Sequence, residues 1–188
     1  AVLGDRVTHI DETADSLLWF STGNSVFRYA RKTGSFLRFD VGGYGEGSIW
    51  SMLADCAGNL WLGMGGNSLL RIRDSRIVSS RRMNFGTSVL AEDRMGELWH
   101  AGYDGTGHFH VGRPERNHSL GYTKENGLTE NTIRAMRVDR EGNVWIGGRD
   151  HGVMKFSEMN TVRFPIPPVN AYTLSHNIHF VGADSSGH

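Results

Sequence analysis

Three histidines have the spacing in this sequence that comes nearest to a metal site. His108 and His110 are two residues apart, so in a β-strand they share one face, and the register of a hairpin could bring His100 opposite one of them. Imidazole nitrogens arranged in this way are ligands of zinc and related ions. Histidines in strands more often pack or lie at an edge, so we expect no metal site.

Two turns and two aromatic residues form a second group, one that suits a sugar or a carboxylate. Charged side chains in the turns would donate or accept hydrogen bonds, and the aromatic rings would offer flat faces for stacking. The alternative is that these turns are simply solvated. The predicted ligand contacts are Tyr44, Trp50, Tyr103, Asp104, Arg149, Asp150 and His151.

Composition excludes several other kinds of function. Neither a Gly-x-Ser-x-Gly elbow nor a His-Glu-x-x-His motif occurs, so we assign no catalytic residue and no cofactor. Lysine plus arginine and aspartate plus glutamate number 20 each, without a basic block, which argues against nucleic acid and direct membrane contact. The lone Cys56 cannot form an intrachain disulfide.

The elements that position these residues come from a repeat. Four segments align on one tryptophan each, and these tryptophans are 42, 38 and 46 residues apart. A turn with Asp and Gly precedes the tryptophan in the last three repeats, whereas the first has Thr13 and Ser16 at those places. We expect these residues to be structural: Trp19, Trp61, Trp99, Trp145, Asp55, Gly58, Asp93, Gly96, Asp139 and Gly142.

Each repeat predicts four short antiparallel strands. In the fourth, residues 133–138, a tight turn at 139–142 and residues 143–147 predict a hairpin, because Asp and Gly favour turn conformations. Third strands are expected at 26–29, 69–72, 108–111 and 153–156, and fourth strands at 35–39, 76–80, 119–123 and 161–164. The run 49–53 does not alternate strictly, which predicts a strand buried on both faces. One large aromatic per repeat favours all-β propeller blades over a sandwich.

The repeats resemble the two-component regulator propeller family. The fourth, AMRVDREGNVWIGGRDHGVMKF, is very similar to the pattern of that family, and the second, DCAGNLWLGMGG, nearly so. The third keeps DRMGELW but has His100 and Ala101 after it. This resemblance implies a sensor propeller of a bacterial signalling protein, located in the periplasm or on the extracellular side of the inner membrane. We expect no signal peptide in residues 1–6.

The expected organisation is one propeller fragment over residues 1–188. Blades are expected at about 7–40, 47–80, 86–123 and 131–165, with the start of a fifth at about 177–188. Because open sheet faces are costly, we expect further blades or a second copy of the chain to cover them.

The function that the resemblance implies is sensing of an oligosaccharide or another small molecule. A structural or protein-interaction propeller is the alternative. A lyase similar to those acting on cyclic peptides, whose repeats Leu18-Trp19-Phe20 faintly resembles, is the second alternative; we expect no enzyme activity.

Overall fold

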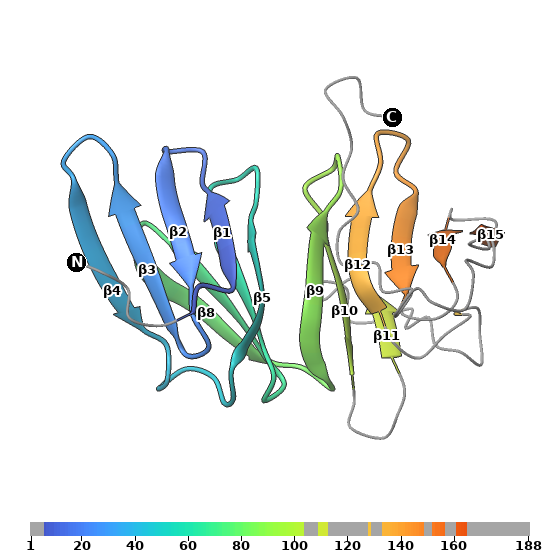
Figure 1. The fold of residues 1–188 in the computed structure, drawn as a ribbon, viewed down its shortest axis with the longest axis horizontal. Helices are drawn as coiled ribbons and strands as arrows, with labels where there is room; N and C mark the ends of the chain where they lie inside the picture. The colour runs from blue at the N-terminus through green and yellow to red at the C-terminus, as the bar shows by residue number, and fades with distance from the viewer. Residues whose placement is uncertain are drawn as a thin grey trace, which may run out of the picture. The chain divides into compact units, whose positions relative to one another are not determined.

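The fold of the chain was taken from a computed structural model, which describes residues 6–103, 109–112, 128, 133–148, 152–156 and 161–164. All regular structure in these residues is β-strand (Figure 1). Among them, no helix has the length and apolarity that a membrane crossing requires. The chain divides into two units, residues 1–90 and 91–188, and each is described by itself.

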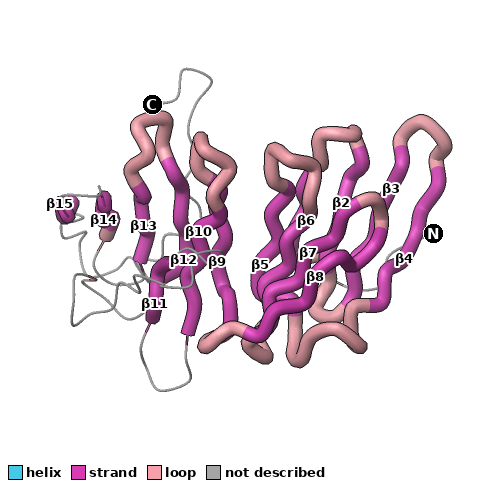
Figure 2. The backbone as a smooth tube through the Cα atoms, turned by 180° about the vertical axis from the view of Figure 1, so that it is seen from behind, coloured by secondary structure: helices cyan, strands magenta, loops and turns pink. Residues whose placement is uncertain are grey.

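Two four-stranded antiparallel sheets make up most of the first unit. One has the order β1-β2-β3-β4, formed by His9–Glu12, Leu17–Ser21, Ser25–Ala30 and Ser35–Asp40. The other has the order β5-β6-β7-β8, formed by Ile49–Ala54, Leu60–Met64, Ser68–Arg73 and Arg76–Arg82 (Figure 2). Consecutive strands pair in simple meanders, as the sequence predicts.

The remaining strands form two more antiparallel sheets. Strands β9, β10 and β11, at Gly86–Glu92, Leu98–Tyr103 and Phe109–Gly112, lie in the order β11-β10-β9. The last sheet has the order β12-β13-β14-β15, formed by Ile133–Val138, Val144–Gly148, Val153–Phe156 and Thr161–Phe164. The predicted strand at 119–123 and the blade start at 177–188 lie outside the described residues.

The first two sheets of the chain pack face to face. Their shared core joins Trp19 and Val26 of one sheet to Leu62, Leu70 and other apolar residues of the next. All five residues of β6 are buried, so burial on both faces falls on the second strand of this sheet. The sequence predicted burial on both faces for the first strand, 49–53. This prediction is wrong for Trp50, which is 41% exposed.

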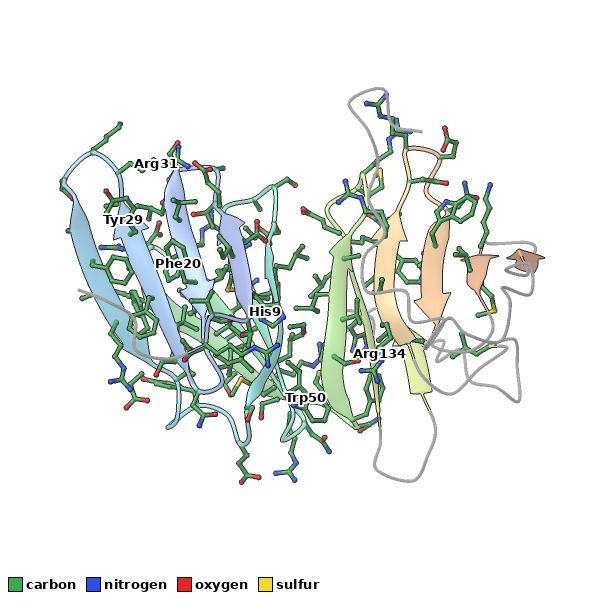
Figure 3. All side chains as sticks on the ribbon, in the orientation of Figure 1. His9, Phe20, Tyr29, Arg31, Trp50 and Arg134 are labelled. Atoms are coloured by element: carbon green, nitrogen blue, oxygen red, sulfur yellow. The ribbon has the colours of Figure 1, made fainter. Side chains whose placement is uncertain are left out.

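The opposite face of the sheet β1-β2-β3-β4 is aromatic and partly exposed. Phe36 lies on the outer strand β4, and its ring centroid is 5.9 Å from that of Phe20, 6.0 Å from that of Phe27 and 5.9 Å from that of Tyr29. Figure 3 shows Phe20 and Tyr29 on this face. Such a contiguous apolar surface on a folded sheet is typical of a contact with another protein surface.

Candidate functional site

The Asp of the last three repeats does more than close a turn. In the second repeat the indole Nε1 of Trp61 donates to Asp55 at 2.7 Å, and the same bond joins Trp99 to Asp93 at 3.0 Å. In the fourth, Trp145 donates to the carboxylate of Asp139 at 2.6 Å. The tryptophan and the aspartate six residues before it are therefore one structural unit.

The first repeat keeps this arrangement with different residues. Trp19 Nε1 donates to Thr13 Oγ1 at 3.1 Å, so a hydroxyl replaces the carboxylate. The Ser16 amide donates to the Thr13 carbonyl at 2.9 Å, as Gly58 does to Asp55 at 3.2 Å. Ser16 accordingly has a φ of 61°, a left-handed conformation that glycine adopts at this place in the other repeats.

Within the described residues, Trp50 is an exposed aromatic side chain at an irregular point of its strand. Strand β5 pairs Ile49 with Met64 and then Ser51 with Gly63, so Trp50 is an extra residue that the ladder leaves unpaired. Such a bulge changes the direction in which a side chain points, and bulges are common beside active sites. This explains why Trp50 is exposed while Ile49 and Ser51 on either side are buried.

Two glycines make room for the indole of Trp50. A Cβ atom on Gly65 would lie 2.5 Å from Trp50 Cε2, and one on Gly86 would lie 2.7 Å from Trp50 Cζ3. Both distances are far below van der Waals contact, so the ring lies directly on the backbone at these two positions. A large aromatic ring that is 41% exposed and lies against backbone in this way is suited to stacking.

The loop before β5 holds this glycine turn in place. The Gly66 amide donates to the Glu46 carbonyl at 2.8 Å, and the Gly65 amide donates to the Ser48 carbonyl at 2.9 Å. Tyr44 belongs to the same loop and is 52% exposed, but its carbonyl accepts a bond from Ser80 on the outer strand β8. Trp50 lies on β5, at the other edge of that sheet.

His100 and His110 of the third repeat are not paired across the hairpin. The hairpin pairs His100 with Gly112 and Gly102 with His110, so the direct pairing that the sequence allowed is wrong for His110. His100 is buried, at 1% exposure. No group of three or more potential metal ligands occurs within the part of the chain that the structure describes, and His108 lies outside that part.

The other predicted ligand contacts cannot be placed in the same way. Tyr103 ends strand β10, and only its backbone is described. Asp104, Arg149, Asp150 and His151 lie outside the described residues. They remain predictions.

Arg134 is a candidate that the sequence prediction missed. Strand β12 has a register shift between Ile133 and Ala135, which makes Arg134 the bulged residue, and its side chain is exposed. Trp50 and Arg134 each lie five residues before the aspartate of their repeat, Asp55 and Asp139. Alignment of the first strands would have shown this equivalence.

His9 adds a titratable group beside Trp50. Its Nδ1 lies 2.8 Å from Ser21 Oγ and 3.1 Å from Thr8 Oγ1. Burial lowers the pKa of His9 below 6.5, and a hydrogen bond with the Trp50 backbone partly opposes this. Figure 3 shows His9 on β1 and Trp50 on β5 toward the same end of their strands.

Residues 127–150 match the two component regulator propeller family. The fourth repeat is therefore similar to the repeat of this family. The matched segment includes Asp139, Gly142 and Trp145, the residues that form the hydrogen-bonded turn, and the family resemblance of the sequence is thereby confirmed. No curated protein matches the sequence.

Solved structures share the fold of the chain. The extracellular domain of the putative one component system BT4673 from B. thetaiotaomicron has a TM-score of 0.71 and 19% identity, covering 100% of this chain and 26% of that one. The extracellular domain of the putative hybrid two component system BT3049 from the same organism has a TM-score of 0.70 and 15% identity, and the match covers 99% of this chain and 25% of that one. Virginiamycin B lyase from Staphylococcus aureus has a TM-score of 0.70 and 15% identity, and the match covers 90% of this chain and 59% of the lyase chain.

These likenesses confirm the all-β propeller fold. The chain spans about a quarter of the two extracellular domains and 59% of the lyase chain. At such low identities the structures show the shared fold and not a shared activity.

Proposed function

We propose that the chain is part of an extracytoplasmic sensor propeller that binds an oligosaccharide, in which Trp50 stacks on a sugar ring. The exposed indole of Trp50 on its glycine support is the observation that carries the proposal. Indole faces bind the apolar C–H faces of sugars, and polar groups nearby then fix orientation. The family match of residues 127–150 supports a place in a regulatory protein.

A rigid indole also suits a sensor for an energetic reason. Because the bulge and the two glycines already fix the ring, little conformational entropy is lost when a ligand stacks on it. A ligand can bias a signalling protein only if it binds one arrangement of that protein better than another. A preformed contact in one arrangement provides such a difference.

The test is a titration of the purified chain with a panel of neutral and acidic oligosaccharides, followed by calorimetry and tryptophan emission. We expect binding to at least one of them, and Trp50→Ala should weaken it by about tenfold or more, equivalent to about 1.4 kcal/mol. Val78→Ala is the control, because Val78 is an exposed apolar side chain on the outer strand β8 and belongs to no predicted site. Equal affinity of Trp50→Ala and the unchanged chain would refute the role of Trp50, and no binding to the whole panel would refute the sugar ligand.

A second function, protein interaction, is favoured by the aromatic face around Phe36. Three aromatic rings surround Phe36 on that face. Phe36→Ser should reduce self-association measured by analytical ultracentrifugation if the face binds a second copy. We propose no catalytic role, because the likeness to the lyase at 15% identity concerns the fold alone.

A further inference from the structure

The outer strands of the first unit concentrate its positive charge. Nine of the ten lysines and arginines in residues 1–90 lie in two segments, 28–38 and 71–82, which belong to β3, β4, β7, β8 and the turns that join them. The segments 7–27 and 39–70 contain no basic residue. Charge that is balanced over the whole chain is therefore unbalanced on these strands.

We propose that the turn between β7 and β8 is a binding site for a tetrahedral oxyanion, the sulfate or phosphate group of an ester, and that Arg28, Arg73 and Arg76 hold this group. The site uses none of the residues around Trp50. It is independent of the oligosaccharide proposed as a ligand of that side chain.

Arg73 and Arg76 are directly opposed in the strand ladder. They form the last pair of β7 and β8, next to the turn, and both are exposed. Opposed residues of an antiparallel pair lie on one face with Cβ atoms about 4.5–5.5 Å apart, where like charges repel. Asp74 in the turn could neutralise one charge, but among the described residues none of these three takes part in an ion pair. The fold thus places two arginines side by side without an acidic partner.

A third arginine reaches the same turn from the other sheet. Arg28 on β3 donates from Nη1 to the Oγ of Ser75, which directly precedes Arg76. The Nε of Arg28 is buried and has no hydrogen-bond partner in the part of the chain that is described. Because Ser75 accepts this bond, its own O–H remains available to donate. Donors from both sheets therefore meet at one turn.

The backbone of the turn is held in an unfavourable conformation. Asp74 and Ser75 have φ values of 48° and 59°, which are left-handed and which Asn-Gly or Asp-Gly usually supply in a two-residue hairpin turn. Residues with side chains in such conformations are common at ligand clamps. The tight turn fixes the Ser75 hydroxyl beside Arg28 and next to the opposed pair.

The number of donors favours a tetrahedral oxyanion over a carboxylate. A guanidinium binds oxyanions with two parallel N–H donors, so a single arginine can satisfy both oxygens of a carboxylate. A phosphate or sulfate ester has three terminal oxygens and can accept from several groups at once. Three guanidinium groups and a hydroxyl match that larger number of acceptors. A bound anion would also offset the repulsion between Arg73 and Arg76.

Charge on an outer strand has another use, because it hinders pairing with the edge of a second sheet. Arg82, at the other end of β8, is exposed and is opposed to Ser68 instead of another arginine. A protective role would make the arginines of β8 equivalent and would give none of them affinity for an anion. Arg82→Gln is therefore the matched control, since it removes the same charge from the same strand.

The experiment compares the Tm of the chain in sodium sulfate or sodium phosphate with its Tm in sodium chloride of equal ionic strength, and calorimetric titration measures binding directly. For a Kd of about 1 mM, an anion at about 10 mM should raise the folding constant about tenfold and Tm by about 3–6 °C. Arg73→Gln should abolish this rise and, without the anion, should be at least as stable as the unchanged chain. Arg82→Gln should keep the rise. Arg76→Lys keeps the charge without the planar fork and should weaken binding several-fold.

The stronger of the two anions identifies the ester, and acetate should bind at least tenfold more weakly. No rise in Tm with either anion would overturn the proposal. An equal loss in Arg82→Gln and Arg73→Gln would also overturn it, because a general effect of positive charge would then explain the binding. Acetate binding as tightly as sulfate and phosphate would refute the tetrahedral ligand. Trp50→Ala should keep the rise in Tm, so a failure of sugar binding is distinguishable from a failure of this site.

Discussion

Replacing Ser16 by glycine should stabilise the protein. Ser16 has a φ of 61°, at the place where Gly58, Gly96 and Gly142 have 82°, 75° and 85°. A left-handed conformation costs a residue with a side chain about 1–2 kcal/mol. Glycine loses more backbone entropy on folding, which offsets about 0.4–1 kcal/mol of that gain. The expected net gain is about 0.5–1 kcal/mol.

The assay is urea unfolding together with calorimetry. For a chain of this length the gain corresponds to about 1–4 °C in Tm. The midpoint in urea should rise with an unchanged slope, since the surface exposed on unfolding does not change.

Gly58→Ser is the converse variant. A Cβ there meets no atom within 4 Å, so any loss of stability comes from the backbone conformation alone. We expect a loss similar in size to the gain from Ser16→Gly. A Ser16→Gly variant that is less stable than the unchanged chain, with Gly58→Ser neutral, would refute the argument from conformation.

Three more predictions concern the repeat. Gly63→Ala should cost about 1–3 kcal/mol in urea unfolding, because its Cβ would lie 2.5 Å from the Thr87 carbonyl. Thr13→Val should cost about 1–2 kcal/mol in the same assay, since it removes the acceptor of the buried indole bond. Burial raises the pKa of Asp139, but the bonds from Trp145 and its turn outweigh burial and lower the pKa. Its contribution to stability is thus present above about pH 4 and lost as pH falls through the lowered pKa; Asp139→Asn should flatten the pH dependence of Tm in that range.

Much of the fold could be predicted because its signals are local. The turn at 139–142 is encoded by Asp139 and Gly142, whose bonds join residues only a few positions apart. The predicted third strand at 153–156 coincides with β14, and the prediction at 26–29 lies within β3. Hydrophobic runs bounded by turn residues contain this information without reference to the rest of the chain.

The candidate site was predicted only in part. Trp50 was recognised as an aromatic that could stack, but the sequence run around it predicted burial on both faces. The bulge that exposes it arises from pairing with β6, and the ring rests on Gly86, which is 36 positions further along the chain. Arg134 was missed because its charge alone does not distinguish it from other surface arginines.

The sequence by itself determined the repeat, the consecutive antiparallel strands of the sheets and the turn with Asp and Gly that precedes three of the four tryptophans. Tertiary structure decided that Thr13 takes the place of an aspartate and that Trp50 is exposed. The physical reason is the range of the interactions. Turns and strands follow from neighbouring residues, whereas the direction of a side chain at a bulge depends on strand register and on sheets that pack only after the chain has folded.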